Sequence, residues 1–148
     1  MAHFAELESK TDPTGFTSDT HLVVKRVVVV ANDYVSSDEH EDGETWCINF
    51  FGGGEWKQTS YNNNFRKQYA GIGFVYNESK NKFLSPQPFA SWSIDSNDNW
   101  QSPVTYPNGD QSAYIIGWDE DNLRWLASKI SDNSNYRWDA DNTQWVSI

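Results

Sequence analysis

Two pairs of carboxylates beside tryptophans are the first residues in this chain that could carry chemistry, and they are Asp119 with Asp121 and Asp139 with Asp141. Glycoside hydrolases use two carboxyl groups held roughly 5–10 Å apart. The sequence Asp-x-Asp-Asn could also bind Ca²⁺ through oxygen ligands, although the Gly and the distal Glu of a calcium loop are missing. Both pairs occupy the same place in a repeated motif, which is poor support for a unique active site. We therefore expect turn chemistry here, with no catalytic residue, no metal and no cofactor.

The repeated motif joins an aromatic or apolar residue and an Asp or Asn, through a short polar turn, to a second aromatic residue. Its four copies are Tyr76–Phe83, Ile94–Trp100, Trp118–Trp125 and Trp138–Trp145. If the two Trp residues of a copy pair across a hairpin, they lie on one face of a two-stranded ribbon. The motif therefore predicts tandem short β-hairpins that contribute aromatic rings to a shared layer.

The spacing also predicts the turns of these hairpins. Pairing Trp118 with Trp125 places Asp119 opposite Arg124 and leaves Asp121–Asn122 as a two-residue turn, and the last copy gives Asp141–Asn142 in the same way. The Ile94 copy is one residue shorter, which predicts a three-residue turn through Ser96, Asn97 and Asp98. A rival interpretation of residues 119–130 is a short amphipathic helix, because Leu123, Ala127 and Ile130 follow helical spacing. We favour the hairpin, since the last copy has no such stripe.

The N-terminal half predicts an antiparallel sheet. Residues 2–7 suit a first strand, and the valine-rich segment 21–31 suits a central strand whose second half is buried on both faces. Between them, residues 8–20 predict a polar insertion. Five acids gather around His40, and they predict a solvated loop (Asp38, Glu39, Glu41, Asp42 and Glu44). Gly52–Gly54 predicts a flexible joint or a bulge.

Composition limits the class of protein. The chain has 148 residues, a net charge of −10 and 16% aromatic residues, and the aromatic content argues for a packed core rather than disorder. We expect a mainly β protein with an N-terminal β domain over 1–82 and a hairpin region over 83–148, packed together as one unit. The absence of a long apolar run and the acid near the N-terminus predict a soluble protein made in a cytosol, with no membrane partner. The single Cys47 predicts a small buried hydrophobe.

Charge changes sign along the chain. Residues 57–82 carry a net charge of +4 between flanks of −8 and −6, and aromatic residues alternate with the basic ones. Such alternation is typical of a groove for single-stranded nucleic acid, but the acidic flanks would repel it. We therefore expect no nucleic acid, and electrostatic complementarity within or between subunits instead. The candidate partner-binding residues are Trp56, Lys57, Tyr61, Arg66 and Lys67.

Several segments resemble a family of small virion-associated structural proteins of marine tailed phages, especially cyanophages. They are Trp56–Asn63, Asn64–Lys67, Gly71–Tyr76 and Phe83–Trp92. The pattern Gly-x-x-Tyr with Phe-x-x-Pro-x-Pro is also similar to a segment of phage tail-fibre-associated proteins. The resemblance implies a protein that is synthesised in the host cytoplasm and resides in the virion, as capsid decoration or as a tail or fibre component. It implies binding to other virion proteins or to further copies of the chain, and no catalysis.

A second function from another class remains open, which is a carbohydrate-binding adhesin that contacts host surface polysaccharide. Aromatic rings can stack on sugars while neighbouring Asp and Asn side chains form hydrogen bonds. The candidate residues are Trp118, Trp125, Trp138 and Trp145. Whether these rings are buried or exposed decides between the two interpretations.

Overall fold

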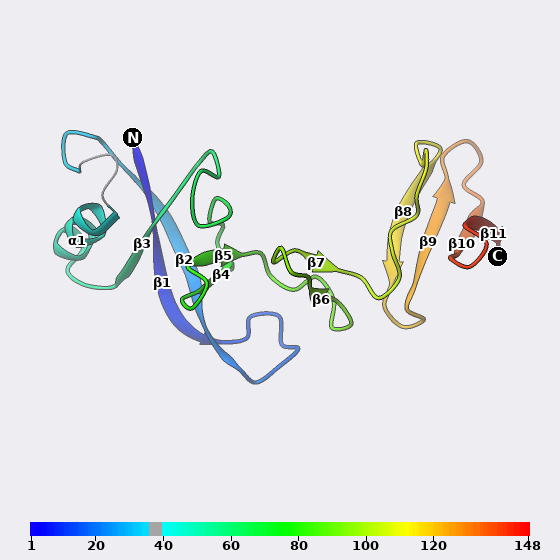
Figure 1. Ribbon diagram of the computed structural model, residues 1–148, viewed down its shortest axis with the longest axis horizontal. Coiled ribbons are helices and arrows are strands. Elements are labelled where there is room, and N and C mark those ends of the chain that lie inside the picture. The colour runs from blue at the N-terminus through cyan, green and yellow to red at the C-terminus, as the bar shows by residue number, and fades with distance from the viewer. Residues whose placement is uncertain (36–39) are drawn as a thin grey trace. The chain divides into compact units, whose positions relative to one another are not determined.

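The computed structural model describes residues 1–35 and 40–148 and divides the chain into two compact units. Unit 1 comprises Met1–Pro86 and unit 2 comprises Gln87–Ile148. Both units are built mainly from antiparallel strands (Figure 1), so the predicted fold class is confirmed. The boundary placed by sequence after residue 82 falls inside a strand of unit 1, Lys82–Leu84.

Unit 1 contains a five-stranded antiparallel sheet in the order β3-β1-β2-β4-β5. Its strands are β1 (Ala2–Thr11), β2 (Thr20–Val30), β3 (Glu55–Thr59), β4 (Val75–Asn77) and β5 (Lys82–Leu84). The long valine-rich strand β2 is third of the five, as its sequence predicts. Its pairing with β1 shifts between Glu6 and Leu7, which marks a β-bulge in the ribbon.

The polar insertion is shorter than the sequence predicts. Residues 8–11 continue β1 and pair with the start of β2, where Thr11 lies opposite Thr20. The loop is limited to residues 12–19 because Asp12 organises it: its Oδ1 accepts the N–H of Thr14 at 2.9 Å and its Oδ2 accepts the N–H of Thr17 at 3.0 Å. Polar side chains do not prevent a strand when the backbone ladder continues.

The acidic segment forms a helix, and the prediction of a solvated loop was wrong for residues 40–44. Helix α1 runs from His40 to Phe51, while Asp38 and Glu39 lie outside the described residues. Acidic residues in the first turn suit the positive end of a helix dipole. The helix ends at Phe51 and is followed by Gly52, which has a φ of 75°, and the Gly53 N–H donates to the Ile48 carbonyl at 2.8 Å. The glycine triplet therefore terminates the helix.

Each face of the unit 1 sheet carries its own core. Helix α1 covers one face, with a cluster formed by Ala2, Phe4, Val30, Val35, Cys47 and Trp56, and Cys47 is buried as predicted. The other core consists of Ala5, Leu7, Val24, Ala70, Tyr76 and Phe83. The chain reaches this second face through residues 70–74, where the Val24 N–H donates to the Phe74 carbonyl at 2.8 Å.

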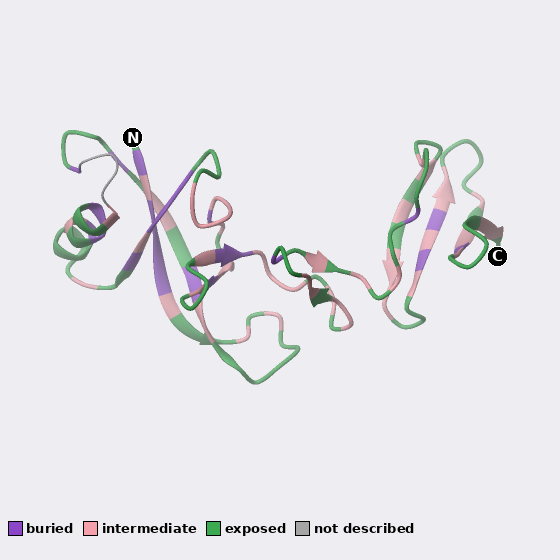
Figure 2. Ribbon diagram, in the orientation of Figure 1, coloured by how far each residue is buried: buried purple, intermediate pink, exposed green. Residues whose placement is uncertain are grey.

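The two cores are staggered along the sheet, and this corrects the expectation that the second half of β2 is buried on both faces. Val30 belongs to the helix-side core, but Val29 is 55% exposed on the opposite face. In Figure 2, β1 is buried or half-buried over residues 2–8 and exposed beyond them, while buried, half-buried and exposed stretches follow one another along β2. The second core lies toward the other end of the ribbon and extends only as far as Val27, which is partly buried against it, so Val29 is left exposed on that face.

Unit 2 contains a four-stranded antiparallel sheet in the order β11-β10-β9-β8 and a two-stranded sheet, β6-β7. The strands are β6 (Ser93–Ile94), β7 (Trp100–Gln101), β8 (Tyr114–Asp119), β9 (Arg124–Lys129), β10 (Asn135–Asp139) and β11 (Gln144–Ser147). The helical alternative for residues 119–130 is therefore excluded. The Tyr76–Phe83 copy of the motif pairs as predicted, but it belongs to the sheet of unit 1.

The hairpin registers are confirmed, whereas the two-residue turns are wrong. Trp118 lies opposite Trp125 and Trp138 opposite Trp145. Four residues connect each strand pair, and positive φ falls on Leu123 and Thr143 instead of on Asp or Asn. The longer connection lets Asp119 and Asp139 each accept hydrogen bonds from the Asn three residues later. The Ile94 copy has the predicted three-residue turn, with positive φ at Asp98.

Candidate binding surfaces

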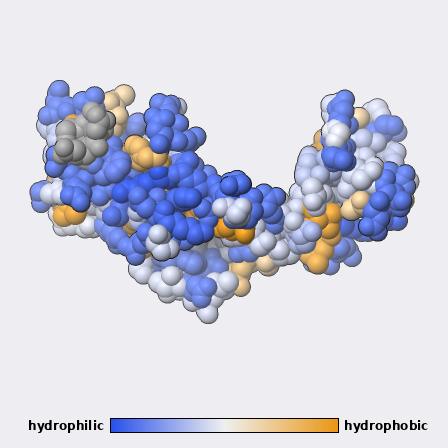
Figure 3. Space-filling view, in the orientation of Figure 1, coloured by the Kyte–Doolittle hydropathy of each residue, from blue (hydrophilic) through white to orange (hydrophobic). Residues whose placement is uncertain are grey.

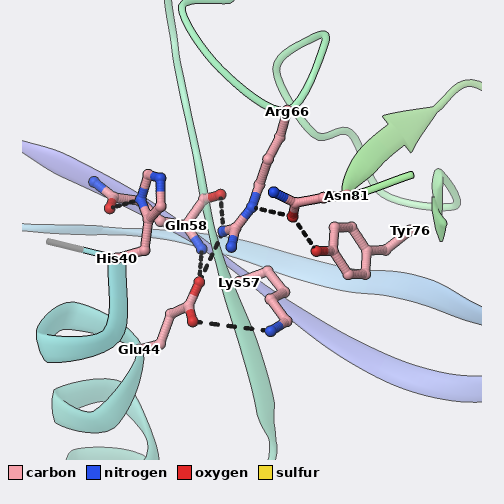
Figure 4. A network of polar contacts seen from close by, with 7 residues as sticks. All are labelled: His40, Glu44, Lys57, Gln58, Arg66, Tyr76 and Asn81. Atoms are coloured by element: carbon pink, nitrogen blue, oxygen red, sulfur yellow. Dashed lines mark hydrogen bonds and ion pairs between the residues drawn. The ribbon is translucent and has the colours of Figure 1, made fainter. Parts of the chain in front are cut away.

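A buried ion pair lies at the centre of unit 1 and uses residues from both the acidic and the basic segments. Arg66 Nη1 lies 2.8 Å from Glu44 Oε1, and it also donates to the Gln58 carbonyl at 2.8 Å (Figure 4). The same Glu44 oxygen accepts the Gln58 N–H at 2.8 Å. Lys57 Nζ lies 4.0 Å from Glu44 Oε2. Helix α1 is thereby joined to β3 and to the loop that follows it.

The network extends to the β4–β5 hairpin. Arg66 Nε donates to Asn81 Oδ1 at 2.9 Å, and the hydroxyl of Tyr76 donates to the same oxygen. The pKa of Tyr76 is raised, first by burial. At the helix end, His40 Nδ1 lies 2.7 Å from Gln58 Oε1. These groups find their partners within unit 1, so the network serves to hold α1, β3 and the β4–β5 hairpin together.

The basic strip predicted for partner binding is largely internal. Trp56 is buried and donates its indole N–H to the Gly53 carbonyl at 3.0 Å, and Arg66 and Lys57 contact Glu44. Tyr61, by contrast, is exposed. The charge complementarity expected within or between subunits is thus formed, for these residues, inside the subunit. Lys67 also takes part in an interaction.

A series of aromatic rings lies on and beside α1, and we call it the helix aromatic patch (Tyr34, Trp46, Phe50 and Phe51); all are exposed except Trp46, which is half-buried against the helix-side core. Trp46 stacks on Phe50 with ring centroids 4.7 Å apart, and Tyr34 lies 5.8 Å from Trp46. Phe50 contacts Phe51 at 4.9 Å. Phe50 is 67% exposed and Tyr34 is 65% exposed. Figure 3 shows the setting: the visible surface is mostly hydrophilic, with hydrophobic residues in small groups.

The helix aromatic patch was missed in the sequence because a loop was predicted for the acidic residues around His40 and no helix was predicted for the residues that follow. The signal was present in the spacing of Trp46 and Phe50, which are four residues apart and so meet on one face of a helix. Arg26 lies over the outer ring of the series, with its Cζ 4.6 Å from the centroid of Phe51. The guanidinium also bonds to Glu6 through Nε, at 2.5 Å from Oε2.

A second aromatic group lies on the opposite face of the sheet. His3 stacks on Tyr61 with centroids 5.6 Å apart, and Tyr69 meets both rings edge-on. Burial lowers the pKa of His3, with a smaller contribution from the N-terminal charge. Burial also raises the pKa of Tyr69. Both shifts favour the uncharged forms of His3 and Tyr69.

The four tryptophans predicted to bind carbohydrate pair as expected, and Trp118 and Trp145 are half-buried. The rings of Trp118 and Trp125 are 5.0 Å apart, as are those of Trp138 and Trp145. Trp125 and Trp138 are buried. The segment before β8 lies against them: Trp92 contacts Trp118 and Trp125, and the Trp125 indole N–H donates to the Val104 carbonyl at 2.8 Å.

The turns of the two Trp–Asp hairpins differ at two positions, Glu120 against Ala140 and Leu123 against Thr143, and the first difference changes the hydrogen bonding. In the first hairpin, Glu120 accepts the N–H of Ser91 at 2.8 Å, the hydroxyl of Ser91 at 2.7 Å and the indole N–H of Trp118 at 2.7 Å. These donors also lower the pKa of Glu120, with Trp118 the largest cause. In the second hairpin the matching residue is Ala140, which has no carboxylate. A hollow of about 360 Å³ lies there, and its lining includes Tyr106, Trp138 and Thr143.

The other face of the unit 2 sheet carries exposed aliphatic side chains. Ile115 and Ile148 are exposed, and with Gly117 and Leu126 they line a shallow hollow of about 600 Å³. Alternation along β8 and β9 places this face opposite the tryptophan layer. It is a second apolar surface in the protein, besides the helix aromatic patch.

Among the described residues, no group of three or more His, Cys, Asp or Glu side chains is placed to hold a metal ion. No helix in the described part of the chain has both the length and the apolar character needed to cross a lipid bilayer. Comparison with protein-family models, with curated proteins and with solved structures finds no match to this chain.

Proposed function

We propose that this chain is a structural protein of a phage virion, either a capsid-decoration protein or a tail- or fibre-associated component, and that it acts by protein–protein contact. The observation that carries the proposal is the helix aromatic patch. Large aromatic rings that are exposed together on a folded surface mark interaction sites in soluble proteins. The resemblance to virion-associated proteins, carried by Trp56–Lys67 and Phe83–Trp92, supports the same conclusion.

The helix aromatic patch has the composition of a binding hot spot. Aromatic residues and Arg dominate the energetics of interfaces, and here Trp46, Phe50 and Phe51 stand beside Arg26. The rings already contact one another in the free protein. A partner would therefore bind them with a smaller loss of side-chain entropy than it would bind isolated rings.

The proposed role is non-enzymatic. The charged side chains that could have formed a reactive centre in unit 1, Glu44 and Arg66, hold secondary-structure elements together. In unit 2, Asp119 and Asp139 accept hydrogen bonds within their own turns. The proposed partners are other virion proteins, further copies of this chain, or a capsid or tail scaffold, and the proposed location is the virion.

Incorporation into particles tests this function. Mass spectrometry of purified particles should detect the chain, and the double variant Tyr34→Ser, Phe50→Ser should be incorporated less because both exposed rings are lost. The matched control is Ile72→Ser, which removes an exposed hydrophobic side chain elsewhere in unit 1. Absence of the unmodified chain from mature particles would exclude a virion component. Equal incorporation of the unmodified chain, the double variant and the control would show that the contact lies outside the helix aromatic patch.

A second candidate function is binding of host surface carbohydrate by unit 2. The observation that favours it is the hollow next to Ala140, where an exposed tyrosine ring, a tryptophan and polar side chains come together. An adhesin of this kind could also be a virion component, so the two functions are compatible.

A further inference from the structure

We propose that the hollow between the Pro103–Asn108 segment and the β10–β11 turn binds one residue of a neutral carbohydrate, an inference that rests on the second candidate function above. The lining that the argument uses consists of Thr105, Tyr106, Asn108, Trp138, Ala140 and Thr143. The volume of about 360 Å³ lies near the lower limit of ligand pockets, which span roughly 300–1,000 Å³. The hollow therefore suits a small ligand unit such as a single sugar ring.

The Tyr106 ring is available for stacking and is held in place from behind. It is 53% exposed, and it meets the Trp125 ring edge-on with centroids 5.0 Å apart. The backbone beside it is fixed by the hydrogen bond from the Trp125 indole to the Val104 carbonyl. A tyrosine ring that is oriented before binding presents a large apolar face at low entropic cost. The C–H face of a pyranose ring is the complementary surface.

The Trp138 indole N–H is a hydrogen-bond donor without an internal acceptor. The other three tryptophans of the two Trp–Asp hairpins donate to Glu120, to the Val104 carbonyl and to Gln111, at 2.7–2.8 Å. Within the described chain, Trp138 has no such acceptor, yet it is not among the groups that are buried without a partner. Trp138 is 9% exposed and lines the hollow, and we therefore assign its unpaired N–H to a ligand oxygen.

Three more polar side chains of the lining are uncommitted. No described residue forms a hydrogen bond with the side chain of Thr105, Asn108 or Thr143, and all three are exposed. Two hydroxyls and an amide, together with an indole N–H and an aromatic ring, supply donors and acceptors for the hydroxyl groups of a sugar. A few polar groups around an aromatic surface are the usual composition of a specific small-ligand site.

The first hairpin shows how the hollow would be closed. There Glu120 occupies the turn position that Ala140 occupies in the second hairpin, and its carboxylate takes up the donors of Ser91 and Trp118. The replacement of a carboxylate by a methyl group leaves the Trp138 donor unpaired. The two hairpins therefore have the same register and different surfaces, and only the second offers a site.

The charge of unit 2 selects against anionic ligands. Nine acidic and three basic side chains give it a net charge of −6. Asp139 directly precedes Ala140, and hydrogen bonds from the side chain and backbone of Asn142 lower its pKa, so it stays ionised. A sulfated or uronic acid polysaccharide would be repelled. We therefore assign a neutral sugar to the hollow.

The proposal is tested by measuring whether the full chain binds the neutral polysaccharides dextran, mannan and galactan. Binding is measured by tryptophan fluorescence and by saturation-transfer NMR, and dextran sulfate serves as the anionic counterpart. At least one neutral polysaccharide should bind and dextran sulfate should not. Tyr106→Ala and Ala140→Glu should each weaken binding at least about tenfold, as loss of a central contact does. The matched control Ala113→Glu adds the same charge at another exposed turn residue of unit 2 and should bind normally.

The outcomes separate the site from the function. If the wild type, Tyr106→Ala and Ala140→Glu bind a neutral polysaccharide equally, the hollow is not the binding site, and the proposed carbohydrate-binding function is retained. Tighter binding of dextran sulfate than of dextran would contradict the assignment of a neutral sugar to the hollow. Failure of the unmodified chain to bind any of the three neutral polysaccharides would overturn both. Because Tyr106 and Ala140 are exposed, unchanged circular dichroism will show that both variants are folded.

Discussion

Arg66 and Glu44 form an ion pair in unit 1, 2.8 Å apart, with side chains that are 7% and 12% exposed. The two residues are 22 positions apart in the sequence, one on α1 and the other in the loop after β3. The pair shows why the charge alternation along the chain is not by itself a sign of a partner surface. Opposite charges meet inside the subunit, and a buried pair cannot be broken without a large cost.

Replacement of Arg66 by Gln should destabilise unit 1 by about 3 kcal/mol, because Glu44 would remain buried with only the more distant Lys57, 4.0 Å away, as a cation. Hydrogen-exchange protection of α1 and β3 in increasing urea will measure the loss. The control is Lys10→Gln, which breaks the exposed pair of Lys10 and Glu8 and should cost less than about 1 kcal/mol. Equal effects of the two variants would show that the Arg66 pair contributes no more than a surface pair.

Replacement of Gly43 by Ala should destabilise unit 1 although Ala favours helices. An added Cβ would lie 2.5 Å from Cε1 of Phe4, whose ring is fully buried, and would overlap that ring. We expect a net loss of about 1–2 kcal/mol, since overpacking exceeds the gain in propensity of about 1 kcal/mol. Thermal unfolding will measure it. Phe4→Leu should cost less in the Gly43→Ala background than alone, and additive effects would contradict the overlap.

The loop of residues 12–19 should loosen in acid. Hydrogen bonds from Thr14, and then from Thr17, lower the pKa of Asp12 from 3.8 to about 2. Because the folded pKa lies below the unfolded one, the stabilisation is present above pH 4 and is lost as the pH falls toward 2. Carboxyl ¹³C NMR should show a titration midpoint near 2. Thr14→Ala should raise it, whereas Thr105→Ala in unit 2 should not, and an unchanged midpoint in Thr14→Ala would exclude the assigned cause.

The turn between β10 and β11 should be improved by an Asn at position 143. Thr143 has a φ of 49°, a left-handed conformation that β-branched residues rarely adopt and that Asn tolerates. Thr143→Asn should stabilise unit 2 by about 1 kcal/mol, measured by hydrogen exchange in β10 and β11. Thr105→Asn serves as the control, because Thr105 is exposed but has no positive φ. Destabilisation by Thr143→Asn would show that the Thr side chain has another role.

The parts of the fold that depend on neighbouring residues were predictable from the sequence. The spacing of Trp118 and Trp125, with alternation across a hairpin, determined the register of β8 and β9, and the shorter Ile94 copy determined a three-residue turn. The turn lengths of the two Trp–Asp hairpins were predicted wrongly. In the first of them, the Asp119 side chain accepts a hydrogen bond from Asn122 in a longer connection. Local patterning therefore established the mainly β class and the aromatic layer of unit 2.

Which residues are exposed at the surface depends on which segment covers which face of a sheet, and only the tertiary structure decided that. Trp56 is buried because α1 and β3 pack together. Val29 is exposed because the second core, on its face of the sheet, does not extend to it. Phe50 points to solvent although its type predicts burial. These outcomes arise from contacts between residues far apart in the chain, whose geometry is set by the packing of whole elements and not by local spacing. The sequence by itself therefore determined the hairpins and their registers, and the tertiary structure decided which aromatic rings remain available for a partner.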